Sequence, residues 1–344
     1  MSFIHQNFDL VIASWFLTAV LCFSLRPFSF NASLVDTPDE RKTHAFSTPL
    51  IGGFCVFVAS SLTLLFFRGI LTNETASMLV AMGCMLMLGL IDDRVDLSAT
   101  IKFFGQAVIS AAFVVSSNCI VTALGTPLGF VAPIELGILS IPFTLLAIIG
   151  LTNAFNMVDG CDGLASSLVL VSLVSLLVVG NSALNNSILV LLLTVSSALT
   201  LFLFFNLSND QNLKTFLGDG GSLSLGFLVS VSLIKFTQSA SNYDPSIALW
   251  FVAVPVLDFC AVIIRRLVLR RKITAADRSH LHHFLASIGF SHFLITSVLC
   301  LTALTLLFLG IFITSQYPKS SVWLFVFVFL LYLFVRFRIN QQGG

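Results

Sequence analysis

The stretch LTNAFNMVDGCDGLASS, residues 151–167, decides how this chain folds, because it places polar side chains between two long apolar runs. Those runs cover approximately 136–152 and 163–180, and their length and composition suit a lipid bilayer. A hydrogen bond between spans is a structural reason for one such polar residue. It is a poor reason for four: Asn153, Asn156, Asp159 and Asp162.

The spacing of these four residues predicts a break in the helix. They recur every three positions, so on one straight helix successive members would be rotated by about 60° and would spread around the cylinder. Gly160 and Gly163 interrupt the pattern. We therefore expect a helix that ends near Met157, a tight turn, and a new helix that begins near Asp162. Such a break gathers carboxylates and amides at one place, and a helix N-terminus there favours a phosphate.

The composition assigns the chain to the membrane. Of its 344 residues, 57% are hydrophobic and 10% are charged, whereas soluble domains carry about 25% charged residues. Mean hydropathy is +1.01. The net charge of +1 gives no reason to expect a nucleic-acid partner, and the seven cysteines show neither a disulfide framework nor a metal motif. No internal repeat or linker is evident, so we treat residues 1–344 as a single integral membrane domain.

A window of roughly 20 residues, enough to cross the bilayer, finds about eleven apolar runs in the sequence. They predict an all-α polytopic membrane protein with about eleven transmembrane helices. The first run is too long for a signal peptide and lacks a cleavage site with a basic start, so we expect a retained span. The runs lie near 8–26, 48–67, 76–91, 100–116, 136–152, 163–180, 187–206, 220–236, 246–265, 291–313 and 320–337.

The basic residues predict the orientation, because Lys and Arg are enriched on the cytoplasmic side of membrane proteins. With eleven spans, fourteen of them fall on one side and three on the other, Arg68, Lys235 and Lys319. This asymmetry predicts a periplasmic N-terminus and a cytoplasmic C-terminus. Acidic residues gather on the same cytoplasmic side, which predicts an active-site cleft there: Asp92, Asp93, Asp96, Asp159, Asp162, Asp219, Asp258 and Asp277.

Two clusters combine charge with paired glycines. RKTHAFSTPLIGG, residues 41–53, offers Arg41, Lys42 and His44 as cationic donors. A basic anchor at a helix start is an alternative for Arg41 and Lys42, but it does not account for the histidine or the paired glycines. FLGDGGSLSLGF, residues 216–227, surrounds Asp219 with glycines that allow a metal-bound phosphate to approach the main chain. By itself a glycine-rich segment is a weak signal, because glycines also serve helix packing.

A third cluster is DDRVD, residues 92–96, which closes a predicted span. On a helix Asp92 and Asp96 share a face, and Asp93 is rotated from Asp92 by about 100°. Three carboxylates this close repel one another unless a cation or a basic partner lies among them. A solvated helix end with Arg94 as partner would explain a lone acidic pair. Three carboxylates at a membrane-embedded helix end favour a functional site instead.

The segment DFCAVIIRRLVLRRKITAADRSHLHH, residues 258–283, adds cations. Asp258 and Arg265 are two helical turns apart on one face, so we expect both to face the same cavity. The basic residues that follow suit an amphipathic helix on anionic lipid. Zinc is disfavoured, because no Cys or Glu accompanies the histidines at ligand spacing. Phosphate recognition is the better interpretation for Arg265, Arg278, His280, His282 and His283.

Together the clusters supply carboxylates and amides for a divalent cation, cations for phosphates, and a cleft at the cytoplasmic ends of a membrane bundle. That combination fits a reaction that joins a soluble phosphorylated substrate to a lipid phosphate. A transporter would place its acidic residues near mid-span, whereas these gather at cytoplasmic helix ends.

Five motifs, in this order and spacing, closely resemble the polyprenyl-phosphate N-acetylhexosamine-1-phosphate transferases, the glycosyltransferase 4 or MraY-WecA superfamily. They are VDTPDERKTHAFSTPLIGG, DDRVD, NAFNMVDGCDGLA, FLGDGGSLSLGF and DRSHLHH, and they span about residues 35–290. The Arg-Lys-x-His start and the His-Leu-His-His loop look like the WecA-type branch. They look less like the MraY branch, which usually has a Thr-Pro-Thr-Met-Gly-Gly start.

The resemblance implies that undecaprenyl phosphate attacks the β-phosphorus of UDP-GlcNAc, giving undecaprenyl diphosphate-GlcNAc and UMP. This would be the initiating step of a lipid-linked surface glycan, such as O-antigen, in the bacterial inner membrane. The same chemistry with another UDP-N-acetylhexosamine, GalNAc or a 6-deoxy sugar, stays an alternative. The family also implies Mg²⁺, with Mn²⁺ as a substitute, and contact with membrane lipid; a homodimer stays open.

The resemblance also assigns roles to individual residues. The implied Mg²⁺ ligands are Asp219 and Asn156, and Asp92 or Asp93 would position the lipid phosphate, deprotonate it or act covalently. Asp159 and Asp162 would complete the catalytic pocket. The substrate-binding set would hold uracil, pyrophosphate and sugar: Lys42, His44, Asn153, Phe216, Asp258, Arg265, Arg278, His280, His282 and His283. Asn153 has the simpler alternative of a hydrogen bond that holds the break in place.

A UbiA-type membrane prenyltransferase is the remaining rival. Such enzymes also use Asp-Asp-x-x-Asp-like motifs with Mg²⁺. A second acidic motif of that kind would be expected, however, and the second cluster here is rich in asparagine.

Overall fold

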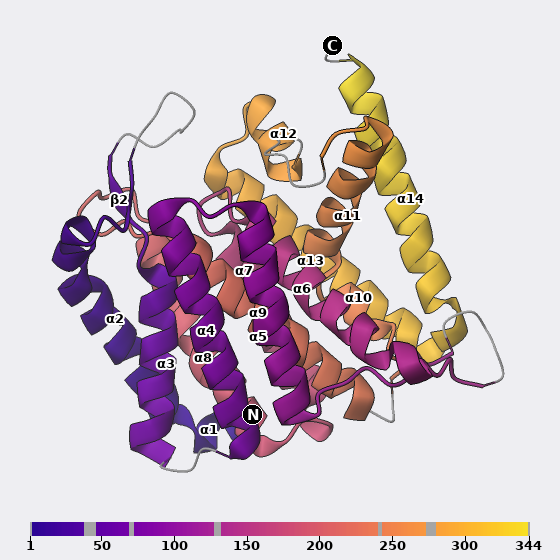
Figure 1. The fold of residues 1–344 in the computed structure, drawn as a ribbon, viewed down its shortest axis with the longest axis horizontal. Helices are drawn as coiled ribbons and strands as arrows, with labels where there is room; N and C mark the ends of the chain where they lie inside the picture. Colours follow the sequence, from indigo (N-terminus) through magenta and orange to yellow (C-terminus); the bar gives the residue numbers. More distant parts are fainter. Residues whose placement is uncertain are drawn as a thin grey trace.

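The computed structural model describes residues 2–37, 46–68, 72–126, 132–239, 243–272 and 280–342. Within these ranges the chain is almost entirely helical, which confirms the predicted all-α class (Figure 1). A two-stranded antiparallel ribbon, β1 (Val35–Asp36) with β2 (Thr48–Pro49), is the one sheet in the described residues. The helices are α1 (Ser2–Gln6), α2 (Phe8–Asn31), α3 (Gly52–Arg68), α4 (Asn73–Val95), α5 (Ala99–Ser117), η1 (Gly137–Leu139), α6 (Ser140–Val158), α7 (Leu164–Val179), η2 (Gly180–Ser182), α8 (Asn186–Asn206), α9 (Gly218–Ser239), α10 (Ile247–Phe251), α11 (Ala253–Val268), α12 (Leu281–Ser287), α13 (His292–Gln316) and α14 (Pro318–Gln342).

Each of the eleven apolar runs coincides with helical structure. In the part of the chain that the structure describes, nine helices are long and apolar enough to cross a membrane. The other two runs form α3, which is shorter, and the α10–α11 pair, which is interrupted at Val252. The chain is therefore a multi-pass membrane protein, and eleven spans stays a prediction.

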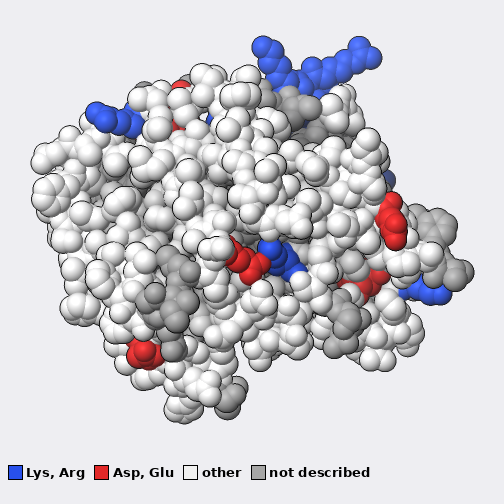
Figure 2. All heavy atoms as spheres, turned by 60° about the horizontal axis from the view of Figure 1, so that its bottom comes forward, with Lys and Arg blue, Asp and Glu red and all other residues white. Residues whose placement is uncertain are grey.

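The surface has the character expected of a bundle in lipid. Large apolar side chains point outward along the helices, among them Phe66, Val115 and Phe308, which are 79%, 81% and 68% exposed. Figure 2 shows a face of the molecule that carries few charged side chains. In water such a surface would be costly, so its natural solvent is the hydrocarbon of the bilayer.

The two ends of the bundle differ. In Figure 1, β2, α12 and the C-terminus lie at one end and the N-terminus lies at the other. This arrangement agrees with chain termini on opposite sides of a membrane. Which side is cytoplasmic rests on the basic residues and stays a prediction.

Helix α9 forms the centre of the bundle. Of its most apolar stretch, 89% is buried, against 17% for α14 at the periphery. It packs against α3, α4, α6, α7 and α10, so it touches both the early and the late helices of the chain. Because the glycine-rich motif begins α9, the first turn of the most buried helix lies among the ends of its neighbours.

Glycines allow α9 to approach its neighbours closely. A Cβ atom on Gly53 of α3 would lie 2.1 Å from the Cα atom of Gly221, and one on Gly89 of α4 would lie 2.3 Å from the nitrogen of Gly220. Both distances are far below van der Waals contact, and in each case the obstacle is main chain. In lipid, where burial adds little to helix association, such close packing of small residues is a main source of stability.

Substitution of Gly53 by alanine should therefore disrupt the packing of α3 on α9. We expect Gly53→Ala to lose about 3 kcal/mol or more of stability, since a rigid backbone cannot yield to the added methyl group. Gly150→Ala is the matched control, because a Cβ atom there meets nothing within 4 Å. Thermal unfolding of both proteins in detergent measures the difference. Equal melting temperatures would contradict the close contact.

Candidate active site

The described residues enclose a cavity of about 1550 Å³ at the end of the bundle that carries β2 and α12. Its walls come from β1 and β2, the C-terminal turn of α4, the α6–α7 connection, the start of α9, and α12 to α14. The polar motifs that lie far apart in the sequence thus meet in one place. The residues of the notable clusters that line it are Asp92, Asp93, Asp96, Asp159, Asp162, Phe216, Asp219, Arg265, His282 and His283.

The polar stretch at residues 151–167 is broken as its spacing predicts. Helix α6 ends at Val158, α7 begins at Leu164, and Gly163 takes a left-handed conformation with φ of 72°. Asn206, the last residue of α8, fixes the turn. Its side chain accepts a hydrogen bond from the Gly163 nitrogen at 2.6 Å and donates one to the Thr215 oxygen at 2.9 Å. The turn is thereby tied to the segment that leads into α9.

A shared cation holds two carboxylates together. The Nζ atom of Lys102, on α5, lies 2.5 Å from Asp92 Oδ2 and 2.6 Å from Asp219 Oδ2. Asn156 donates a hydrogen bond to the other oxygen of Asp219 at 2.8 Å. An ammonium group between two carboxylates offsets their mutual repulsion and the cost of removing them from water. This position therefore favours positive charge.

Asp93 has a different task from that of its neighbour Asp92. Its carboxylate accepts hydrogen bonds from the backbone nitrogens of Asp219 and Gly220, at 3.0 and 3.3 Å. These nitrogens belong to the first turn of α9, whose N–H groups have no partner within the helix. Asp93 therefore acts as a cap supplied from another helix, and it fixes the position of Asp219.

The two carboxyl groups in the α6–α7 turn are held in different environments. Burial, together with the nearby carboxylates of Asp219, Asp93 and Asp162, raises the pKa of Asp159 well above its ordinary value. Burial acts in the same direction on Asp162, but hydrogen bonds from His292 and Lys214 outweigh it and lower the pKa of Asp162. These surroundings thus favour the charged form of Asp162 and the protonated form of Asp159.

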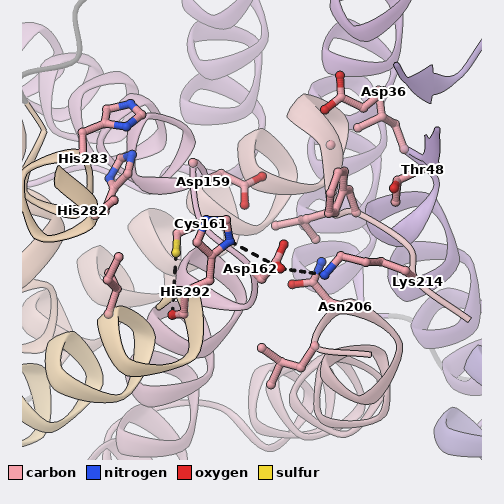
Figure 3. Close-up of a pocket in the computed structure, with 18 of the residues that line it drawn as sticks. Asp36, Thr48, Asp159, Cys161, Asp162, Asn206, Lys214, His282, His283 and His292 are labelled. Atoms are coloured by element: carbon pink, nitrogen blue, oxygen red, sulfur yellow. Dashed lines mark hydrogen bonds and ion pairs between the residues drawn. The ribbon is translucent and has the colours of Figure 1, made fainter. Parts of the chain in front are cut away.

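Figure 3 shows how Asp162 joins two sides of the cavity. Lys214 lies 2.6 Å and His292 lies 3.4 Å from Asp162 Oδ2. His282 and His283 lie on the opposite side of Asp159 from Lys214 in this view. Positive and hydrogen-bonding groups thus flank the acidic centre, as recognition of a phosphorylated molecule requires.

The histidines are packed ring against ring. His282 and His283 have ring centroids 4.2 Å apart, and His280 stacks on His282 at 5.7 Å. Burial, followed by its two histidine neighbours, lowers the pKa of His282 to about 3. His282 is therefore neutral at physiological pH, and it serves as a hydrogen-bonding group where the sequence suggests a cation. Its Nε2 atom is buried without a partner in the described residues.

Gly160 provides the space that this histidine occupies. A Cβ atom at residue 160 would lie 2.4 Å from His282 Nε2. The α6–α7 turn and the histidine segment, more than 100 residues apart in the sequence, are thus in direct contact.

Three of the expected substrate ligands do not line the cavity. Asp258 is 2% exposed and binds His280, so the expectation that it faces the same cavity as Arg265 is wrong. Asn153 exchanges hydrogen bonds with Gln106 of α5 at 2.5 and 3.3 Å. It joins α6 to α5 one turn before the site, which matches its simpler alternative. His280 also lies behind the cavity wall, held by Asp258.

Phe216 and Arg265 do line the cavity, as their substrate-binding roles require. Lys42, His44 and Arg278 fall outside the described residues. Their roles stay predictions.

Sequence reasoning missed several residues of the site. Lys102 is the one charged residue in the span Ala99–Ser117, and an ionisable residue inside a span is by default a candidate for function. The position of Lys102 within a span therefore indicates a functional residue, in addition to its contribution to the predicted orientation. Asn206, Lys214 and His292 carry no motif, and only the folded chain brings them to the α6–α7 turn. Arg336, in the last helix, also lines the cavity.

Comparison with known proteins finds relatives over nearly the whole chain. The model of "Glycosyl transferase family 4" matches residues 75–237. The chain is 34% identical over 313 residues to the "Probable undecaprenyl-phosphate N-acetylglucosaminyl 1-phosphate transferase" of Bacillus subtilis, covering 90% of this chain and 84% of the relative. It is 30% identical to the "Undecaprenyl-phosphate alpha-N-acetylglucosaminyl 1-phosphate transferase" of Yersinia pestis, covering 96% and 92% of the two chains. The like-named protein of Escherichia coli K12 is 29% identical, with 97% and 91% covered.

The chain belongs to glycosyl transferase family 4. The matched residues 75–237 hold α4 to α9, and with them most of the acidic side of the cavity in this family 4 chain. The histidine side, in α12 to α14, lies beyond the family model but within the span shared with the relatives. The resemblance that the five motifs carry is therefore confirmed.

The neutral state of His282 in this family 4 protein predicts a pH effect on stability. An unfolded histidine binds a proton below about pH 6.5, whereas folded His282 stays neutral down to about pH 3. Its contribution is therefore complete above pH 6.5 and is lost progressively as the pH falls. Between pH 7 and pH 5 the wild-type protein should lose about 2 kcal/mol more than His282→Asn.

Thermal unfolding of both proteins in detergent at the two pH values measures this difference. The exposed His5 supplies the control, because His5→Asn should retain the wild-type pH response. Equal losses of stability in the wild-type protein and in His282→Asn would contradict a neutral His282.

Proposed function

We propose that this chain transfers GlcNAc 1-phosphate from UDP-GlcNAc to undecaprenyl phosphate in the bacterial inner membrane. An oxygen of the lipid phosphate attacks the β-phosphorus, the bond to the bridging oxygen of the α-phosphate breaks, and UMP leaves. The names of the relatives, each an undecaprenyl-phosphate N-acetylglucosaminyl 1-phosphate transferase, support this substrate pair. A lipid-linked surface glycan such as O-antigen is the proposed use of the product.

The observation that carries the proposal is the pair of carboxylates, Asp92 and Asp219, that line the cavity and share the ammonium group of Lys102 behind its wall. The cavity volume of about 1550 Å³ exceeds the roughly 300–1,000 Å³ of pockets for a single small ligand. It therefore has room for a nucleotide sugar beside a lipid phosphate. The barrier to their reaction is the repulsion between two anionic groups, which positioned cations lower.

The side chains suggest a division of tasks. Lys102 and Asp92 would orient the lipid phosphate at the end of α4, since Asp93 is engaged in holding α9. Asp159, whose raised pKa keeps a proton available, is placed to exchange it with an incoming or departing phosphate oxygen. His282 and His283 would hydrogen-bond to the pyrophosphate from the other side of the cavity.

The donor set fits Mg²⁺ in its chemistry. Asp219 and Asn156 both carry oxygen atoms, the ligands that this ion prefers. The amide nitrogen of Asn156 faces Asp219 in the structure, so the amide would turn over to offer its oxygen to a bound ion. Asp219 already holds the cation of Lys102. Within the described ranges, no three His, Cys, Asp or Glu side chains stand at metal-ligating spacing. We keep Asp219 and Asn156, the pair that the family resemblance implies, as the residues that would hold the ion, where it would neutralise charge on the pyrophosphate, with Mn²⁺ as a substitute.

The activity is tested by incubating the purified protein with undecaprenyl phosphate and a panel of UDP-sugars, with Mg²⁺ or a chelator, and following UMP. We expect release with UDP-GlcNAc that depends on the metal and falls at least about 100-fold in Asp219→Asn. Release with UDP-GalNAc or a 6-deoxy sugar alone would keep the reaction and change the substrate. No release with any sugar, or release indifferent to Asp219→Asn, would refute the proposal.

Lys102 offers a second test of the same site. Lys102→Met keeps the length of the side chain and removes the ammonium group that Asp92 and Asp219 share. We expect kcat to fall about 100-fold, the usual cost of losing one group that stabilises transition-state charge. Lys319→Met, at the start of α14 and outside the residues that line the cavity, is the control and should keep full activity. Unchanged turnover in Lys102→Met would remove this residue from the mechanism.

A further inference from the structure

Helix α14 is the most lipid-exposed of the candidate spans, yet one narrow face of it points into the protein. On this face Ser321 accepts a hydrogen bond from the Trp250 indole at 3.0 Å, and Phe325 packs edge-on against the Trp250 ring. Two further residues of α14, Tyr332 and Arg336, follow Phe325 at helical spacing on the same face, and Arg336 lines the cavity. Polar side chains on an otherwise lipid-facing helix are energetically costly unless they have partners in the protein interior.

Tyr332 ends a buried chain of hydrogen bonds that leads to the histidines. Its hydroxyl donates to Asp258 Oδ1 at 2.9 Å, an oxygen that also accepts the backbone N–H of Leu281 at 2.9 Å. The other oxygen of Asp258 lies 2.8 Å from His280 Nδ1. Asp258 thus fixes the ring of His280 and the first residue of α12, and Tyr332 fixes Asp258.

Arg336, one turn further along α14, supports the same segment at a second point. Its guanidinium carbon lies 5.6 Å from the ring centroid of Phe284, in α12, and the side chain is 8% exposed. Phe284 and Arg336 both line the cavity. The last helix therefore supports the histidine segment on both sides of His282 and His283, indirectly through Asp258 and His280 at one end and by direct contact with Phe284 at the other.

We propose that the inward face of α14, through Tyr332 and Arg336, positions the histidine segment so that His282 and His283 reach the substrate. Neither residue reacts in this proposal; Tyr332 acts through Asp258 and His280, whose ring stacks on His282. A stacked pair transmits a displacement of its first ring to the second, because close-packed rings cannot move independently. The kinetic part of the test rests on the proposed transferase function.

Tyr332→Phe removes one hydroxyl and keeps the ring. We expect kcat/KM for UDP-GlcNAc to fall about tenfold, the effect of one hydrogen bond to a charged group, mainly through a higher KM. A mere loss of folded protein would lower the apparent kcat and leave KM unchanged. Tyr317→Phe makes the same chemical change at an exposed tyrosine between α13 and α14, and it should leave both constants at wild-type values.

A double-mutant cycle separates positioning from a general loss of stability. In a His280→Ala background, Tyr332→Phe should have less than about a twofold further effect, because the path through Asp258 is already cut. If the two substitutions multiply their effects, Tyr332 does not act through His280, and the proposal is overturned.

Chemical modification tests the same contact without any substrate. Diethyl pyrocarbonate reacts with accessible neutral imidazoles, and mass spectrometry reports the rate at each histidine. His282 is 4% exposed, so its reaction in the wild-type protein should be slow. Tyr332→Phe should increase the rate at His282 several-fold, and Tyr317→Phe should not. Equal rates would overturn the proposal even if the transferase activity is confirmed; if no UDP-sugar reacts at all, this measurement still decides it.

Arg336 has its own matched control on the same helix. Arg336→Met and Arg338→Met each remove a guanidinium group that lies near a phenylalanine ring, at 5.6 and 5.3 Å. Only Arg336 faces the protein, whereas Arg338 is exposed. We expect the rate of His282 modification to rise in Arg336→Met alone. An equal response of the two variants would show that α14 does not position the segment through this residue.

Discussion

The ammonium group of Lys102 is the interaction on which the site depends. Asp92 lies at the end of one span and Asp219 at the start of another, and Asp93 and Asp159 add further carboxyl groups beside Asp219. Carboxylates in such a place repel one another and would separate the helix ends or take up protons. One lysine, held on α5 by an otherwise apolar span, allows two of them to remain close. Carboxylates that require a cation can also hold one beside a phosphate, so this location suits a reaction in which a cation stabilises charge on the phosphate.

This electrostatic arrangement is possible only because the helices come close enough. Gly53 and Gly89 allow α3 and α4 to contact the backbone of α9 at Gly220 and Gly221. The N-terminal turn of α9 then lies beside the C-terminal turn of α4, where Asp93 accepts its N–H groups. Packing and chemistry therefore share the same few residues. A glycine-rich motif that is ambiguous in the sequence serves both purposes in the fold.

The opposite wall of the cavity is built on another principle. There the groups are neutral or shared: His282 is uncharged, and Asp258 binds the adjacent residues His280 and Leu281 as well as Tyr332 of the last helix. Hydrogen-bonded networks of this kind fix orientation, because every member has its geometry determined by a partner. One side of the cavity thus stabilises charge, and the other fixes the orientation of hydrogen-bonding groups. A nucleotide sugar that contacts both sides of the cavity would be held by charged groups on one side and by oriented hydrogen bonds on the other.

The sequence by itself determined the membrane class, the positions of the apolar runs and the break between α6 and α7, because hydropathy and spacing are local properties. It also found the acidic clusters and the histidine pair that line the cavity, since their motifs are contiguous and the family resemblance links them. It failed where a contact depends on distant parts of the chain. Asp258 and Arg265 share a helix face by spacing, yet Asp258 turns to His280 and Tyr332 because buried carboxylates need donors.

Only the tertiary structure decided which charges are paired and which groups are neutral. Lys102 could be recognised in the sequence as an unusual charge within a span, but not as the partner of Asp92 and Asp219, which lie on two other helices. The lowered pKa of His282 follows from burial among other histidines, which no motif contains. Local pattern fixes where a helix begins and ends. Packing fixes the dielectric surroundings and the partners of each polar group, and these determine the chemistry that the group can perform.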